Sequence, residues 1–251
     1  MIITDLDNTL LRSDKTISEY TIDVLKKCQS KGVKVAFATA RSAQGSSRFL
    51  EQFTPDIFIG YGGALVSVGD KVIHRFDISA NISSQIIKEC LNTAEVLSVS
   101  AINESIALSS NRKYLEQRDS SHYQYTDFSD NLNYRYLKIS LRATDAATVE
   151  KIAAHYPMCD MLRYTGEDLY RFANRGAVKW NAVKTVAKYF NINTKSFVAF
   201  GDDYNDWEML RKCGIGVAVK NAIEEVRYTA KYICETNDND GVAKWIEEHA
   251  L

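Results

Sequence analysis

Short apolar runs alternate with amphipathic segments in the first part of the chain. The expected strands are the apolar runs 1–4, 33–39 and 56–60. Because these runs are apolar on both faces, they fit parallel strands that are covered on both sides. A helix is predicted over 18–30, with Ser18 at its N-cap and Gly32 just beyond its end, and a second helix at about 43–53. This order of strands and helices predicts a doubly wound, mostly parallel α/β sheet.

The pattern changes in the middle of the chain. A hairpin is expected in 64–76, where two alternating runs meet at Gly69-Asp70, a Gly-first pair that suits a type II′ turn. Helices are then predicted at 83–95 and near 144–155. The strand-like runs between and after them are 96–102, 105–110, 134–142, 158–165 and 168–173. Strands that alternate between apolar and polar residues, with helices between them, predict a separate α+β unit with a mostly antiparallel sheet.

The buried-strand pattern returns after Gly176. The expected strands are 196–203, 214–219 and 231–234, and the expected helices are 179–190, one from about 206, and 222–230. The middle unit therefore interrupts a core domain of the doubly wound type. We predict a core domain formed by 1–79 and 173–251, with an inserted α+β cap domain at 80–172.

Composition excludes several classes of protein. The 251 residues have a formal net charge of −1, whereas nucleic-acid binding needs a concentrated basic surface. No apolar run approaches the roughly 18 residues of a membrane span, and Asp5 interrupts the layout of a signal peptide. The five cysteines are odd in number and far apart, which suits reduced thiols. We therefore expect a cytoplasmic globular protein whose partner is neither nucleic acid nor a membrane.

Polar groups gather where the expected parallel strands end. These groups are Asp5, Asp7, Thr39, Arg41, Asp202, Asp203, Asn205 and Asp206. Lys179 opens the helix that returns to the core domain. Open α/β sheets bind ligands at the carboxyl ends of their strands, so we expect these distant segments to meet at one rim of the sheet.

Several carboxylates beside one lysine are unfavourable unless a cation joins them. Mg²⁺ fits best, because it prefers hard oxygen ligands and combines one or two carboxylates with phosphate and water. Asp5 and Asp202 would supply carboxylates, and Asp7 a backbone carbonyl. With the cation bound, a carboxylate can attack a dianionic phosphate, and other groups spread the developing charge. The groups suited to hold the phosphate oxygens are Thr39, Lys179 and Asn205.

At this point the motifs resemble those of a known family. The segment 5–9, DLDNT, resembles the D-x-D-x-T signature of the haloacid dehalogenase-like hydrolase superfamily. Thr39, Lys179 and GDDYND at 201–206 stand in the order and spacing of its remaining motifs. The insertion resembles the type IIB cap of the Cof-like sugar-phosphate phosphatases. The resemblance covers essentially the whole chain, and the four motifs together are highly specific.

The resemblance implies catalysis through an aspartyl-phosphate. Asp5 would be the nucleophile, and Asp7 the general acid and then the general base. The metal-binding residues would be Asp5, Asp7 and Asp202. The phosphate-binding residues would be Leu6, Thr39, Ala40, Lys179 and Asn205. The supporting residues would be Thr9, Arg41, Asp203 and Asp206. Two segments depart from the family pattern: Asn8 where Gly is more usual, and YGGA at 61–64 where Asn-Gly-Ala is more usual.

We predict a Mg²⁺-dependent phosphatase of small phosphorylated metabolites, with sugar phosphates as the leading class. A phosphomutase, which returns the phosphoryl group to a sugar hydroxyl, uses the same aspartyl-phosphate and stays open. A signalling receiver-type module pairs acids, Mg²⁺ and a lysine on a doubly wound sheet, but such modules are about half this length. A non-catalytic binding protein is a further alternative. A dehalogenase is disfavoured, because displacing a halide has little use for the second acid and the metal-site aspartates.

Some residues also admit a structural interpretation. Asp203 is favoured as a helix cap over a direct metal ligand. Arg41 is equally compatible with a phosphate contact and a surface charge. One face of the alternating strand 134–142 has Tyr134, Tyr136, Lys138 and Ser140. We interpret that face as solvated in preference to a polar-aromatic lid over a sugar phosphate.

Overall fold

The computed structural model of the chain describes residues 1–117, 123–130, 133–163 and 167–251. These residues form two compact units, which we call the core unit (Met1–His74 with Val178–Leu251) and the inserted unit (Arg75–Ala177). The boundaries expected from the sequence, after residues 79 and 172, both fall within the inserted unit. The difference has a local cause. Ile78 forms an isolated β-bridge with Tyr136 of the inserted unit, and the last strand of that unit continues to Asn174.

Within the described residues, the core unit contains an eight-stranded sheet in the order β14-β13-β12-β1-β2-β3-β4-β5. The strands are β1 (Ile2–Thr4), β2 (Val35–Ala38), β3 (Ile57–Gly60), β4 (Leu65–Val68), β5 (Lys71–Arg75), β12 (Val198–Gly201), β13 (Ile215–Val219) and β14 (Tyr232–Cys234). Neighbours from β14 to β3 are parallel, and β4 pairs antiparallel with β3. β4 and β5 form the expected hairpin, which turns at Gly69 with a φ of 53°. The doubly wound, mostly parallel sheet is confirmed.

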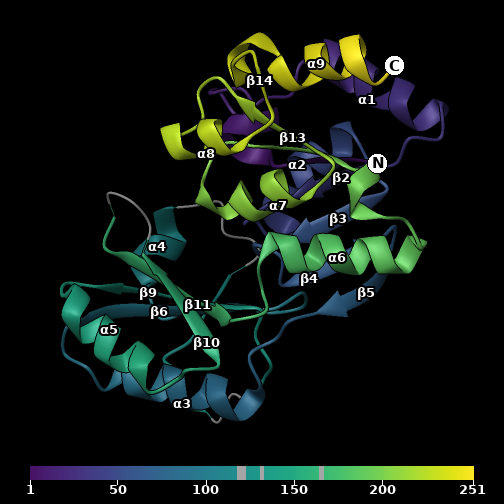
Figure 1. The fold of residues 1–251 in the computed structure, drawn as a ribbon. Helices are drawn as coiled ribbons and strands as arrows, with labels where there is room; N and C mark the ends of the chain where they lie inside the picture. The colour runs from purple at the N-terminus through teal and green to yellow at the C-terminus, as the bar shows by residue number, and fades with distance from the viewer. Residues whose placement is uncertain (118–122, 131–132, 164–166) are drawn as a thin grey trace. The chain divides into compact units, whose positions relative to one another are not determined.

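Helices lie on both faces of this sheet, with α1 against α9 on one face and α6 against α7 on the other (Figure 1). They are α1 (Glu19–Ser30), α2 (Ser47–Gln52), α6 (Lys179–Phe190), α7 (Trp207–Lys212), α8 (Glu224–Thr229) and α9 (Gly241–His249). Ser18 caps α1 as predicted, because its hydroxyl accepts a hydrogen bond from the backbone N–H of Thr21 at 3.0 Å. Helix α9 was not among the elements predicted from the sequence. Its Trp245 packs edge-on against Phe200 of β12, with ring centroids 5.5 Å apart, and so completes the core.

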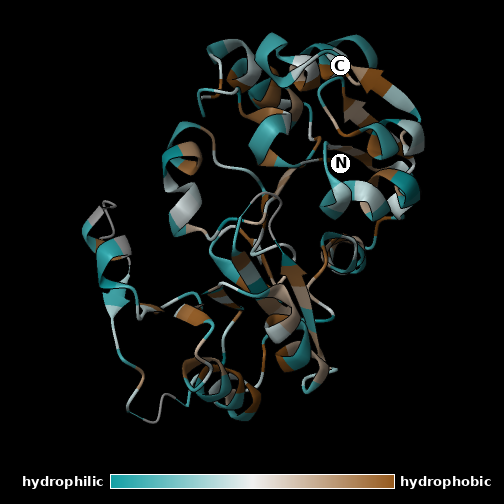
Figure 2. Cartoon of the chain, turned by 90° about the vertical axis from the view of Figure 1, so that its left-hand side faces the viewer, coloured by the Kyte–Doolittle hydropathy of each residue, from teal (hydrophilic) through white to brown (hydrophobic). Residues whose placement is uncertain are grey.

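The inserted unit has a six-stranded sheet in the order β10-β11-β9-β6-β7-β8 within the described residues. The strands are β6 (Val96–Ile102), β7 (Ala107–Ser109), β8 (Gln124–Tyr125), β9 (Lys138–Ala143), β10 (Cys159–Arg163) and β11 (Leu169–Asn174), and the helices are α3 (Ala80–Leu91), α4 (Arg112–Gln117) and α5 (Ala146–Ala154). Helices α3 and α5 bury their apolar residues against one face of this sheet. Figure 2 shows the two-sided character of such helices, whose ribbons alternate between hydrophilic and hydrophobic residues. The α+β class of the insertion is confirmed.

One expected face of the inserted unit is wrong in part. Tyr136 was expected beside Lys138 and Ser140, but regular strand geometry begins only at Lys138. Tyr136 is instead fully buried in the apolar cluster with Ile139 and Leu141, and this burial raises the pKa of its phenol to about 12. The end of the expected strand 158–165 lies outside the described residues.

Candidate active site

Asp5 stands directly after β1, where the chain makes a tight turn. This turn, η1 (Leu6–Leu10), contains Asn8 in the left-handed region with a φ of 56°, which asparagine tolerates better than most residues. Leu6 and Leu10 are buried in the core cluster and anchor the turn. The turn therefore presents a buried carboxylate on Asp5 and a partly exposed one on Asp7.

A buried cluster of carboxylates surrounds one lysine in the core unit. Carboxylate oxygens of Asp5, Asp202 and Asp206 all lie within 4.8 Å of one another. The Nζ atom of Lys179, at the start of α6, donates to Asp5 Oδ1 and to Asp206 Oδ1, each at 2.6 Å. Thr9 completes the network by donating from its hydroxyl to Asp202 Oδ1 at 2.9 Å. The structure thus brings together residues from three distant segments of the chain.

The charges of this cluster do not balance. Burial raises the pKa of Asp5 well above its usual range, with Lys179 opposing the shift and the neighbouring Asp206 and Asp202 adding to it. Burial and the nearby Asp206 also raise the pKa of Asp202, to about 6. For Lys179, burial favours the neutral form, but the two carboxylates that it contacts outweigh this effect and raise its pKa. The three buried carboxylates offer hard oxygen ligands, and the single ammonium of Lys179 does not balance their charge. These carboxylates therefore fit a divalent cation.

Asp206 lies in the cluster itself, although the sequence suggested only a supporting role. Its second oxygen, Oδ2, accepts from the backbone N–H of Asp202 at 3.1 Å. Glycine at position 201 allows this geometry, since a Cβ there would lie 2.3 Å from the Cβ of Asp206. Asp203 is exposed and takes part in a capping box at η4 (Tyr204–Asp206), which agrees with the helix-cap interpretation. Asn205, in the same turn, is exposed, and no described contact joins it to the cluster.

The second aspartate of the first motif is paired with cations. The guanidinium of Arg41 binds Asp7 in a bidentate manner, from Nε to Oδ2 and from Nη2 to Oδ1, both at 2.7 Å. Lys15 Nζ lies 3.1 Å from Asp7 Oδ1. Burial alone would raise the pKa of Asp7, but Arg41 and Lys15 together lower it. Arg41 thus contacts a catalytic candidate, and Lys15 is a neighbour that no sequence motif indicated.

The turn at 61–64 ties two of the predicted segments together. Thr39 is buried after β2, and its carbonyl accepts from the backbone N–H of Gly62 at 2.9 Å. Gly63, with a φ of 104°, packs so closely on the start of α6 that a Cβ there would lie 2.5 Å from the carbonyl carbon and oxygen of Val178. Tyr61 and Gly62 also adopt positive φ values, of 54° and 71°. This turn therefore fixes Thr39 and Lys179 relative to each other. Ala40 follows Thr39 and is partly exposed.

Two asparagines that the motifs did not indicate hold the η1 turn. Asn221 Nδ2 donates to the carbonyl of Asn8 at 2.7 Å, and its Oδ1 accepts from the backbone N–H of Asn237 at 3.0 Å. The buried side chain of Asn237 then donates to the carbonyl of Leu11 at 2.9 Å. Asn221 follows the carboxyl end of β13, so the rule that selected the other strand ends would also have selected it.

Comparison with known proteins assigns the family. The family model of the haloacid dehalogenase-like hydrolases matches residues 2–246. The chain belongs to the haloacid dehalogenase-like hydrolases. The resemblance seen in the motifs is confirmed, including the Cof-like subgroup with a type IIB cap.

Relatives of this haloacid dehalogenase-like hydrolase are named as phosphatases. The chain is 26% identical to the 5-amino-6-(5-phospho-D-ribitylamino)uracil phosphatase YitU of Bacillus subtilis, over 99% of this chain and 97% of the relative. It is 27% identical to a putative phosphatase of Haemophilus influenzae, over 98% and 97%. The solved structure of the HAD subclass IIB sugar phosphatase BT4131 matches with a TM-score of 0.82 at 22% identity, over 98% and 97%. Our chain is thus an enzyme, a phosphoric monoester hydrolase. No helix in its described part has the length and apolar character that a membrane crossing requires.

Proposed function

We propose that the protein is a Mg²⁺-dependent phosphatase of small phosphorylated metabolites, with sugar phosphates as the leading substrate class. The observation that supports this most directly is the buried cluster of Asp5, Asp202 and Asp206 around Lys179. A nucleophilic carboxylate, a cation-binding set and a phosphate-neutralising lysine are the parts that phosphoryl transfer needs. The five cysteines are free and buried, which suits a reducing compartment, so we also propose a cytoplasmic location.

The proposed reaction has two displacements at phosphorus. In the first, a carboxylate oxygen of Asp5 forms a bond to phosphorus while the bond to the ester oxygen breaks, and Asp7 gives its proton to that leaving oxygen. In the second, water attacks the aspartyl-phosphate, Asp7 takes a proton from the water, and inorganic phosphate leaves Asp5. The ion pair of Asp7 with Arg41 and Lys15 stabilises the carboxylate form, which is the form that accepts a proton in the second step. The proton that Asp7 takes from water there is the one that it gives to the leaving oxygen of the next substrate.

Lys179 has two tasks in this proposal. It holds the carboxylate of Asp5 through one N–H and that of Asp206 through another, so that Asp5 keeps a fixed orientation. Lysine has three N–H donors, and the third is suited to a phosphate oxygen. The other proposed phosphate-binding groups are Leu6, Thr39, Ala40 and Asn205.

Asp5 and Asp202 are suited to hold Mg²⁺, with the backbone carbonyl of Asp7 and with Asp206 nearby. A bound Mg²⁺ supplies Lewis-acid neutralisation of phosphate charge. The proposal for this ion depends on the donor set, because three carboxylates exceed the charge that Lys179 alone can balance. Thr9 and Asp206 then act as supports, the first by holding Asp202 and the second by holding Lys179.

A panel of phosphate esters assayed for released phosphate tests this function. We expect hydrolysis of several sugar phosphates with Mg²⁺, and a loss of at least about 100-fold in rate after chelation. Restoring Mg²⁺ should restore the rate, which separates metal loss from irreversible damage. Isomerised sugar phosphate without released phosphate would show a phosphomutase instead. A phosphorylated Asp5 that persists without turnover would show a phospho-acceptor module.

A further inference from the structure

The sheet of the inserted unit has a second face that α3 and α5 do not cover. On β11, Tyr170 and Phe172 belong to the apolar cluster beneath these helices. Arg171 lies between them in sequence, so its side chain belongs to the opposite face, which we call the outer face. Strand register places Arg171 opposite Ser140 of β9, and Ser140 opposite Ser100 of β6. An arginine and two hydroxyls therefore lie in one row across three strands.

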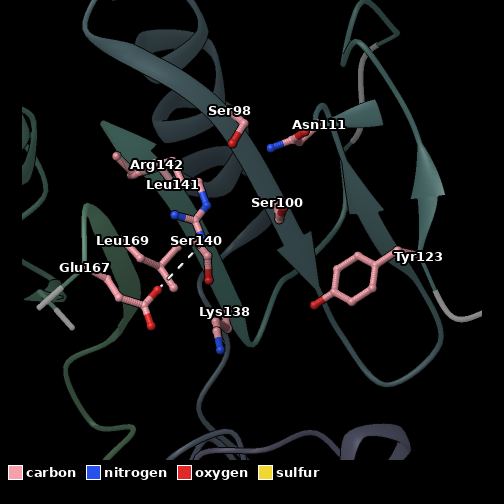
Figure 3. A pocket seen from close by; sticks show the side chains of 10 residues that line it. All are labelled: Ser98, Ser100, Asn111, Tyr123, Lys138, Ser140, Leu141, Arg142, Glu167 and Leu169. Carbon is pink, nitrogen blue, oxygen red and sulfur yellow. Dashed lines mark ion pairs between the residues drawn. The ribbon is translucent and has the colours of Figure 1, made fainter. Parts of the chain in front are cut away.

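A pocket of about 190 Å³ opens on this outer face (Figure 3). Its polar lining includes Ser98, Ser100, Ser140, Lys138, Arg142 and Glu167. Figure 3 shows the serines on the strands of the pocket floor, with the Arg142–Glu167 ion pair on one side and Lys138 at the lower end. That ion pair is loose, at 3.7 Å. Arg171 does not line this pocket, but it lies in the same row as two residues that do, Ser140 and Ser100. Together with the lining residues named above, Arg171 gives the outer face three cationic side chains and one carboxylate.

Arg171 is the residue that most needs an explanation. It is only 6% exposed, and its Nε has no hydrogen-bond partner among the described residues. None of the described carboxylates forms an ion pair with it. A buried guanidinium without a counter-charge is costly, and a buried unsatisfied donor in a native protein calls for an explanation, such as a water or an ion that pairs with it. Arginine is also the side chain best suited to bind a carboxylate or phosphate by two parallel hydrogen bonds.

We propose that the outer face of the inserted unit is a binding site for an anionic, hydroxyl-rich small molecule. The anionic group, a carboxylate or a phosphate, pairs with Arg171 and is attracted by Lys138. The hydroxyls of the ligand exchange hydrogen bonds with Ser98, Ser100 and Ser140, each of which can donate and accept. This ligand is either the leaving part of the substrate or a separate molecule. The binding itself is independent of the proposed function, and only its use in substrate selection rests on that function.

Calorimetric titration of the full-length protein with gluconate and with sorbitol tests the site. These probes have the same chain length, but only gluconate is charged, and neither is a phosphate ester. We expect gluconate to bind at least about tenfold more tightly than sorbitol, because Arg171 is otherwise unpaired. Arg171→Met should remove this difference. The matched control is Arg163→Met, which changes an exposed arginine on the covered side of neighbouring β10 and should leave gluconate binding unchanged.

The stability of the variant provides an independent readout. Replacing a buried, unpaired charge by an apolar side chain should leave the melting temperature equal or raise it. If Arg171→Met does not fold, Lys138→Met in the more exposed part of the pocket takes its place, with an expected loss of at least about threefold in gluconate affinity. Gluconate binding that is absent, or that is unchanged in the folded variants, overturns the proposal.

Kinetics separates the two sources of the ligand. The test compares kcat/KM for 6-phosphogluconate and sorbitol 6-phosphate, which differ only in the carboxylate. If the substrate supplies the anion, the first is preferred by at least about tenfold in kcat/KM, and Arg171→Met abolishes the preference through KM. If gluconate binds but the two esters react equally, the site holds a separate molecule. If neither ester is hydrolysed while gluconate still binds, the proposed function fails and the site stands.

Discussion

The core unit and the inserted unit bury charge of opposite sign. Around Lys179, three carboxylates share one ammonium. On the outer face of the inserted unit, Arg171 has no carboxylate partner among the described residues, and its cross-strand neighbours are Ser140 and Leu162. The first arrangement calls for a cation and the second for an anion. We therefore expect the two charge clusters to act separately. A substitution in the core cluster should change the reaction rate but not gluconate binding, and Arg171→Met should change gluconate binding but not the chemical step.

The largest expected effect is that of Asp5→Asn in the core unit. Asparagine is nearly isosteric and can still accept from Lys179, but it is not a nucleophile, so we expect turnover to fall on the order of 10⁴-fold or more. The melting temperature should stay equal or rise, because one of three mutually repelling carboxylates is lost. Steady-state phosphate release and thermal unfolding measure these effects.

The same variant tests whether the two units act separately. Gluconate binding to Asp5→Asn should equal that of the wild type, because the proposed site lies within the inserted unit alone. A parallel loss of gluconate binding would show that the two charge clusters are not independent. Near-normal turnover would remove Asp5 from its assigned role.

An intermediate effect is expected for Asn221→Ala. This change removes the bond to the carbonyl of Asn8 and frees the N–H of Asn237, so the η1 turn loses a restraint on Asp5 and Asp7. Small displacements of reacting groups lower rates strongly, and we expect kcat to fall by about tenfold with KM within about threefold. Asn239→Ala, an exposed change in the adjacent turn, is the control. If Asn221→Ala changes kcat and Arg171→Met changes KM, the separation of reaction chemistry in the core unit from ligand binding in the inserted unit is supported. If both variants change KM, that separation is contradicted.

The smallest effect concerns stability and pH. Asp240 accepts hydrogen bonds from Arg12, Ser18 and Thr21. Burial alone would raise its pKa, but the bonds from Arg12 and Ser18 outweigh that effect and lower it below 3.8. Its stabilisation is therefore present above pH 3.8 and is lost as the pH falls through the folded pKa.

Asp240→Asn keeps a residue that tolerates the φ of 54° found at this position. We expect it to lower the free energy of unfolding by about 1–2 kcal/mol at pH 7, with the difference from wild type shrinking below pH 3.8. Chemical denaturation of the variant and the wild type at pH 7 and below pH 3.8 measures this difference in the free energy of unfolding. Hydrogen exchange in the inserted unit should be unchanged, and a change there would mean that the two units share their stability. A pH-independent difference would argue against the charge of Asp240 as its cause.

Local patterns predicted the core unit better than they predicted the site geometry. The apolar runs gave the parallel strands, because burial on both faces leaves a clear signal. The placement of Asp206 beside Lys179 depends on the tight turn after Gly201, which spacing alone does not reveal. Tyr136 was misplaced because an isolated bridge to Ile78 shifts the start of the strand. Such a shift depends on a pairing with a distant segment.

The outer face illustrates the same limit. Alternation along β9 correctly placed Lys138 and Ser140 on one side. Arg171 appeared in the sequence as one residue of an ordinary strand-like run. Its significance arises only from the register of β11 with β9, which brings it opposite Ser140, and from the absence of a described partner for its Nε. Non-local register is not encoded in any short motif.

The contact of Gly63 with Val178 has a consequence for how such proteins diversify. The chain re-enters the core unit at Val178, and there the backbone of the 61–64 turn is pressed against it without room for even a methyl group. Lys179 is thereby placed from inside the core, whatever sequence precedes it. Evolution can exchange or reshape the intervening hundred or so residues as a replaceable module, while Lys179 keeps its position in the core unit.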